Sequence, residues 1–261
     1  YLGDNARAPY GVRTQKEIFQ FTLEGVRFLF EKGCPLVILA CNTASSQALR
    51  KIQQEVLPRE FPDRHVLGVI RPAAEYLGKH GRRVGIFATP ATVESNAYVH
   101  ELYKLCHPER GIRVEGSRDP KIPPLPTVGR DDYIRVTQQA CPGLTDLIES
   151  GEHEGDTCDR LVKSFVEDLL VKDPRIEEIL LACTHYPLVY NLFRKHVPPQ
   201  IHVLTQGEIV AETLARYLTN HPEIESQLEK TSVHEYFTTD AKNLSNLAST
   251  FYGSDLEFQK A

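Results

Sequence analysis

A repeated pattern constrains the fold of this chain more than any other feature of its sequence: an apolar run that ends at a cysteine and is followed by small polar residues. Residues 37–40 lead into Cys41, and residues 178–182 lead into Cys183. A short apolar run followed by a helical pattern predicts a buried parallel strand and its crossover helix. Open sheets of this kind bind ligands at the carboxyl ends of their strands. The repeat therefore predicts an α/β fold built by duplication, with one thiol on each side of a substrate.

The composition is that of a soluble globular protein, with 41% hydrophobic and 25% charged residues. Its 261 residues are enough for two modest domains or one large domain. The net charge of -5 argues against nucleic acid as the main partner. An anionic substrate would then be held locally, by helix N-termini and a few donors. No apolar run could span a bilayer and the first residues do not resemble a signal peptide, so we expect no membrane partner.

The six cysteines occur singly, without a CxxC pair and without histidines at zinc-finger spacing. A chain of this length has enough core to fold without disulfides, so we expect reduced thiols, a cytoplasmic location and no metal site. The sequence has no GxSxG, P-loop, GxGxxG or HExxH motif, which leaves serine hydrolase, nucleotide-binding and zinc-peptidase functions without support. No lysine stands in a context typical of a pyridoxal phosphate Schiff base, and this favours chemistry without a cofactor.

Predicted strands and helices alternate along the chain, which indicates parallel sheets. Besides the two cysteine motifs, we expect strands at residues 66–70, 83–87, 112–115, 133–138 and 201–204. Threonines mark several helix starts. Thr14 and Thr205 each precede a glutamate by three residues, as in a capping box, and Thr92 is a candidate cap of a helix that runs to Tyr103.

We predict two similar parallel-sheet α/β domains related by a pseudo-twofold duplication, with the active site in the cleft between them. The first comprises residues 1–70 and 205–219, and the second comprises residues 71–204. Residues 220–261 form a helical or partly ordered appendage. Residues 117–132 are rich in proline and charge and predict an exposed insertion.

A lone cysteine at the end of a strand is more often a small buried hydrophobe than a nucleophile. The duplicated context favours the catalytic interpretation for Cys41 and Cys183, because each precedes a helix start. Unpaired backbone N–H groups and the helix dipole at such a position lower a thiol pKa from its usual value of about 8.5. The other cysteines keep the structural interpretation, although Cys141, before Pro142, could also line a pocket.

Polar residues follow both cysteines and suit two roles. Asn42, Thr43 and Thr184 could be plain helix caps. The same hydroxyl and amide donors at a helix N-terminus could also bind a carboxylate. His185, two residues after Cys183, could be packed in the interior or could face the site as a proton partner, and we favour the second interpretation.

Several stretches resemble motifs of bacterial glutamate racemases. The two most specific are Ala40-Cys41-Asn42-Thr43-Ala44-Ser45 and Ala182-Cys183-Thr184-His185-Tyr186-Pro187-Leu188. Residues 3–11 (GDNARAPYG) are similar to the family's GDxARxPYG segment, and residues 89–95 (TPATVES) are similar to its GTxGTxxS loop. Cys141-Pro142, with Leu147 and Glu149, approximates its CPxxxxLxE stretch. The resemblance extends from Tyr1 to about Thr219.

The resemblance implies that Cys41 and Cys183 are the two acid–base thiols, and that His185 and Glu149 assist Cys183. It also implies a set of substrate-binding residues for the carboxylates and the ammonium: Tyr10, Gly11, Asn42, Thr43, Thr184 and His185, with Thr92 as a further addition. Members of the family make D-glutamate for peptidoglycan in the bacterial cytoplasm, without pyridoxal phosphate or metal and commonly as homodimers. We therefore expect a cofactor-free, homodimeric glutamate racemase that serves cell wall biogenesis and cell shape.

The chain departs from the family at its start. The family opens with a strand and an Asp-Ser-Gly motif that binds substrate and assists the first cysteine, and this motif does not occur here. Because the chain begins abruptly at Tyr1 and contains no methionine, we expect the motif to lie upstream of Tyr1.

Three alternatives stay open. An aspartate racemase or a related cofactor-free racemase would use the same thiols, since motif spacing does not determine the length of the substrate side chain. A catalytically silent amino-acid-binding protein would bind glutamate without exchanging its α-proton. A peroxide-reducing thiol enzyme would need a thiol redox cycle, so racemisation in a fully reduced, anaerobic preparation would exclude it.

Overall fold

The structure is a computed structural model that describes residues 1–80, 82–105, 113–114, 134–231, 233–240 and 256–261. The predicted insertion at residues 117–132 lies outside this part of the chain. Among the described residues, no helix is both long enough and apolar enough to cross a membrane.

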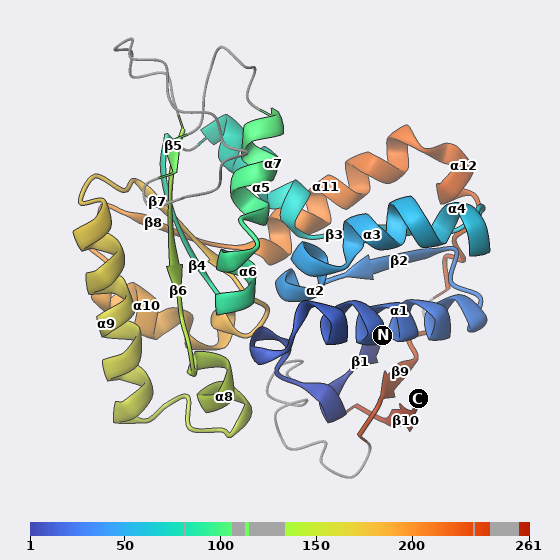
Figure 1. Ribbon diagram of the computed structural model, residues 1–261, viewed down its shortest axis with the longest axis horizontal. Coiled ribbons are helices and arrows are strands. Elements are labelled where there is room, and N and C mark those ends of the chain that lie inside the picture. Colours follow the sequence, from blue (N-terminus) through green and yellow to red (C-terminus); the bar gives the residue numbers. More distant parts are fainter. Residues whose placement is uncertain (81, 106–112, 115–133, 232, 241–255) are drawn as a thin grey trace.

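Parallel strands form one larger and two smaller sheets in the described residues. The larger sheet contains β4 (Arg83–Ala88), β5 (Arg113–Val114), β6 (Arg135–Ala140), β7 (Glu178–Ala182) and β8 (His202–Thr205), in the order β5-β6-β4-β7-β8. The smaller sheets pair β2 (Leu36–Leu39) with β3 (His65–Gly68), and β9 (Tyr236–Thr238) with both β1 (Leu2–Gly3) and β10 (Phe258–Lys260). Figure 1 shows the larger sheet in one half of the molecule and the smaller sheets in the other. The predicted α/β fold with parallel sheets is confirmed, and the domain boundaries remain a prediction.

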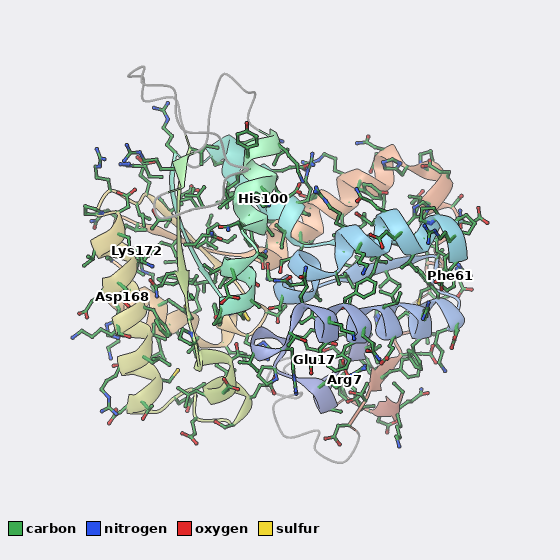
Figure 2. All side chains as sticks on the ribbon, in the orientation of Figure 1. Arg7, Glu17, Phe61, His100, Asp168 and Lys172 are labelled. Carbon is green, nitrogen blue, oxygen red and sulfur yellow. The ribbon has the colours of Figure 1, made fainter. Side chains whose placement is uncertain are left out.

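The central strands β4 and β7 of the larger sheet are buried on both faces, as in other parallel sheets. The helices that cover it include α5 (Ile70–His80), α7 (Ala97–Leu105), α9 (Asp156–Lys172) and α10 (Tyr190–His196). Ile86 and Leu180 pack with α5 and α7, whereas their neighbours Phe87 and Leu181 pack with α9 and α10. Figure 2 shows the charged Asp168 on α9, and this side chain is exposed. Burial on both faces explains why β4 and β7 carry apolar runs without alternation.

Helix α1 (Gln15–Glu31) packs against β2 and begins at the predicted capping box. Thr14 accepts a hydrogen bond from the N–H of Glu17, and the Glu17 carboxylate accepts one from the N–H of Thr14. Val26 and Phe30 lie on the buried face of α1 and pack in the core of this half. The chain after β2 continues through α2 (Asn42–Gln47), α3 (Leu49–Lys51), a π-helical turn (Ile52–Val56) and α4 (Leu57–Glu60). The Thr14 capping box is confirmed.

The helix start predicted at Thr92 is wrong by one turn. Thr89 is the N-cap, because its hydroxyl accepts the N–H of Thr92 and Pro90 occupies the first helical turn. The helix is also not continuous to Tyr103. It is divided into α6 (Pro90–Glu94) and α7, since Asn96 between them has φ of 50°, a left-handed conformation that ends a helix.

The second predicted capping box is also wrong. Thr205 is the N-cap of α11 (Gln206–Asn220), but its side chain makes no capping hydrogen bond. Gln206, the next residue, is buried and its side chain is hydrogen-bonded to residues of other elements. Tertiary contacts thus determine how this helix begins.

The segment after α11 is not only helical. It contains the short α12 (Pro222–Glu225) and then β9, which lies between β1 and β10. Phe237 and Thr238 of β9 are buried. The Thr239 hydroxyl donates to Asp4 Oδ1 at 2.8 Å, and so ties this segment to the first residues of the chain. Strands of three residues are too short to show a period in the sequence.

Candidate active site

The carboxyl ends of β2 and β7 bring Cys41 and Cys183 into one region. Cys41 is the N-cap of α2, and Cys183 directly follows β7. Thr89 directly follows β4, whose last residue Ala88 pairs with Ala182 of β7, and its hydroxyl lies 2.8 Å from that of Thr43, two residues after Cys41. The ends of the two cysteine strands therefore lie close together. Burial raises the pKa of Tyr98, and negative charge on Cys183 adds to the effect. The Tyr98 hydroxyl is bonded to Asn42, which directly follows Cys41.

The thiol of Cys41 is harder to ionise than the sequence predicts. Burial raises its pKa to about 11. The nearby N–H groups of Ala44 and Thr43, and the Thr43 hydroxyl, lower the pKa but do not offset burial. The predicted lowering of the Cys41 pKa is therefore wrong, because removing a thiolate from water is more unfavourable than these donors are favourable. At neutral pH, Cys41 carries its proton.

Cys183, His185 and Glu149 form a hydrogen-bonded row. Nδ1 of His185 lies 3.8 Å from Sγ of Cys183, and Nε2 lies 2.5 Å from Oε1 of Glu149, the last residue of α8 (Leu144–Glu149). Burial alone lowers the pKa of His185, but hydrogen bonds and charge interactions with Cys183 and Glu149 raise it to about 10. The hydrogen bond with His185 lowers the pKa of Glu149. At neutral pH a cationic imidazole therefore lies between a carboxylate and the sulfur.

Thr184 belongs to the same turn as this row. Thr184 is exposed, and its hydroxyl lies 3.3 Å from Nδ1 of His185.

Within the residues that the structure describes, no group of three or more His, Cys, Asp or Glu side chains is arranged to hold a metal ion.

Three threonine hydroxyls form a buried cluster where α2 meets α6. Oγ1 of Thr43 lies 2.8 Å from that of Thr89 and 3.3 Å from that of Thr92, and the last two are 3.0 Å apart. Gly11 lies against the same cluster, since a Cβ at this position would be 3.0 Å from Cβ of Thr89. Sequence reasoning missed Thr89 as a site residue. Its position directly after β4, the neighbour of β7, is the signal that could have found it.

Tyr10 lies near Cys41 and is held by Asp4. Its hydroxyl donates to the Asp4 carboxylate, which also accepts from Arg7 at 2.9 Å. Burial, followed by the interaction with Asp4, raises the pKa of Tyr10, and negative charge on Cys41 adds to the effect. Asp4 is a further residue that sequence reasoning left without a role, although it lies in the same GDNARAPYG stretch.

The side chain of Asn42 has two partners within the protein. Its Oδ1 accepts from the Tyr98 hydroxyl at 2.7 Å, and its Nδ2 donates to Gln206 Oε1 at 2.5 Å. Asn42 is only 2% exposed. The resemblance implies that the Asn42 side chain contacts the substrate, but in the structure this side chain is hydrogen-bonded within the protein. No local sequence pattern indicates Tyr98 or Gln206, because neither adjoins a cysteine motif.

We expect the charge on His185 to make stability fall at alkaline pH. A histidine whose pKa is raised on folding stabilises the fold fully below its unfolded value of 6.5, and this contribution is lost as the pH rises to about 10. Urea unfolding across this range should show a steeper loss of unfolding free energy for the wild type than for His185→Asn. Equal slopes for His185→Asn and the wild type would contradict the prediction.

The chain is similar over its whole length to proteins of known activity, although no family model matches it. A glutamate racemase from Paracoccus denitrificans is 39% identical over 274 residues, which cover 100% of this chain and 89% of the relative. A glutamate racemase isoform from Bacillus anthracis matches with a TM-score of 0.79 at 26% identity, covering 100% of this chain and 86% of that one. A glutamate racemase from Aquifex pyrophilus matches with a TM-score of 0.70 at 29% identity, covering 100% and 87%. The chain therefore belongs to the glutamate racemase family of amino-acid racemases.

Proposed function

We propose that this protein interconverts L- and D-glutamate by proton transfer at Cα between two cysteine thiols, without pyridoxal phosphate or metal. Inversion needs an acid–base group on each face of Cα, because a single base tends to return the proton to the face it came from. The observation that carries the proposal is that Cys41 and Cys183 follow strands of different sheets whose ends meet, through the 2.8 Å contact between the Thr43 and Thr89 hydroxyls. Membership of the family supports glutamate as the substrate.

The proton transfer takes two steps. One thiolate removes the α-proton, so that the Cα–H bond breaks, an S–H bond forms, and the electron pair stays on Cα and spreads into the α-carboxylate. The opposite thiol then gives its proton to the other face of Cα and becomes the thiolate. Cys41 enters as the acid, because burial keeps it protonated. We assign Cys183 as the base, with the cationic His185 as its proton partner at 3.8 Å from the sulfur. The other enantiomer requires the opposite protonation.

The carbanionic intermediate needs stabilisation, since the α-proton is far less acidic than a thiol. Without a cofactor, preorganised donors at the α-carboxylate must supply it. We assign this task to the Thr43 and Thr184 hydroxyls together with the helix start at Asn42, and we place Thr92, Tyr10 and Gly11 around the rest of the substrate. Glu149 keeps His185 charged and oriented through their hydrogen bond.

The proposal is tested by α-proton exchange. Purified protein is incubated in D2O with L- or D-glutamate, while proton NMR follows the Cα–H signal and circular dichroism follows the enantiomer ratio. Loss of the signal from both enantiomers, with convergence to a racemic mixture in a reduced anaerobic sample, is expected. Calorimetric binding without exchange would favour a silent amino-acid-binding protein, and faster exchange of aspartate would favour an aspartate racemase. Cys34→Ala is the matched control and should retain activity, because Cys34 is a partly buried cysteine packed against the core of the first half.

We further propose that the protein acts in the cytoplasm as a homodimer and supplies D-glutamate for peptidoglycan synthesis and cell shape. Membership of the glutamate racemase family supports this role. Light scattering of the purified protein would test the oligomeric state.

A further inference from the structure

Three buried side chains from separate elements close a ring of hydrogen bonds next to Cys41. The Tyr98 hydroxyl, on α7, donates to Oδ1 of Asn42 at 2.7 Å. Nδ2 of Asn42, the first residue of α2, donates to Oε1 of Gln206 at 2.5 Å. Nε2 of Gln206, the first residue of α11, donates to the Tyr98 hydroxyl at 2.6 Å. Tyr98 is 0%, Asn42 2% and Gln206 9% exposed, so water does not replace these bonds easily.

The direction of the ring is determined by a fourth contact. Nε2 of Gln206 lies 3.5 Å from the carbonyl oxygen of Val69. A carbonyl only accepts, so the amino group of Gln206 faces Val69 and Tyr98 while its oxygen faces Asn42. Asn42 must then present its amino group to Gln206 and its oxygen to the Tyr98 hydroxyl. The ring thus leaves Asn42 a single amide orientation.

We propose that Tyr98 and Gln206 are positioning residues for the racemisation, which act by holding Asn42 and, through it, the first turn of α2. The inference rests on the proposed function. Asn42 directly follows Cys41, which is the N-cap of α2, and it is the first residue of that helix. Rotation of Asn42 would move this turn, and the Cys41 thiol would lose its alignment with the Cα of the substrate. A displacement of about 1 Å can slow a reaction about a hundredfold.

Two substitutions break the ring on opposite sides of Asn42. Tyr98→Phe keeps the aromatic ring but leaves Oδ1 of Asn42 without its donor, and Gln206→Leu removes the acceptor of Nδ2. Each variant should lower kcat by about ten- to one-hundredfold, with a much smaller change in KM. Because both act through Asn42, adding either to Asn42→Ala should have no further effect on kcat.

Matched controls separate positioning from general loosening of the protein. Tyr103→Phe removes another tyrosine hydroxyl from α7 and should retain kcat. Gln47→Leu removes a different bond between α2 and the second half, from Nε2 to the carbonyl oxygen of Ala91 at 2.9 Å, and should also retain kcat. Hydrogen exchange of the backbone amides of residues 43–46, measured by mass spectrometry, reports on the first turn of α2 without any substrate. It should quicken in Tyr98→Phe and Gln206→Leu and not in the controls.

The exchange and kinetic results decide the proposal together. Faster exchange and lower kcat in both ring variants, with both controls at wild-type values, supports it. Unchanged exchange in the ring variants, or an equal fall of kcat in Gln47→Leu, overturns it. If the wild type does not racemise glutamate, the proposed function fails, and the exchange of residues 43–46 still decides whether the ring holds this turn.

Discussion

Replacing either Cys41 or Cys183 by alanine is expected to abolish the interconversion of L- and D-glutamate. Each variant retains an acid–base group on only one face of Cα, so inversion has no complete route. Loss of a general acid or base typically slows a reaction by about 10²- to 10⁴-fold, and we expect the decrease in kcat for racemisation to lie near the upper end. Circular dichroism of glutamate solutions measures this rate directly.

The two cysteine variants should also differ from each other in a defined way. The remaining thiol can still remove and return a proton on its own face, so each variant should exchange the α-proton of one enantiomer with solvent deuterium, without inversion. Cys41→Ala and Cys183→Ala should act on opposite enantiomers. Normal turnover in both directions by either variant would reject the two-thiol scheme. Cys34→Ala should retain activity, and this control shows whether removing any cysteine lowers the rate.

His185→Asn is expected to produce the second largest loss of activity. The side chain provides positive charge 3.8 Å from the sulfur of Cys183, and Glu149 holds it in place at 2.5 Å. Asparagine cannot carry this charge, so we expect kcat to fall by about a hundredfold. Glu149→Gln keeps a hydrogen-bond acceptor but loses the carboxylate charge, so kcat of this variant should fall by about tenfold. Steady-state kinetics with each enantiomer at neutral pH measures both effects.

The control for these variants is a second histidine–carboxylate pair in the same half of the molecule. Nε2 of His196 lies 2.8 Å from Oδ1 of Asp159, and neither residue is part of the proposed site. His196→Asn should retain wild-type kcat. If His185→Asn also retained it, the assignment of His185 as the partner of Cys183 would be wrong.

Several features follow from local patterns in the sequence. The apolar runs before Cys41 and Cys183 predict parallel strands that end at the two thiols, and both strands are present as β2 and β7. The capping box at Thr14 and Glu17 involves residues three positions apart, so it forms from local chemistry. Such features need no partner from elsewhere in the chain.

Other features depend on segments that are distant in sequence, and only the tertiary structure decided them. The sequence by itself determined the α/β class, the two thiols at strand ends and the family. The tertiary structure decided that Cys41 is protonated, because its pKa depends on how completely the surrounding elements remove water from the sulfur. It also decided that Asn42 is bonded to Tyr98 and Gln206, which lie 56 and 164 residues away in the sequence. Hydrogen bonds of this kind arise only when segments distant in the sequence meet, and no periodicity or spacing within one segment encodes them.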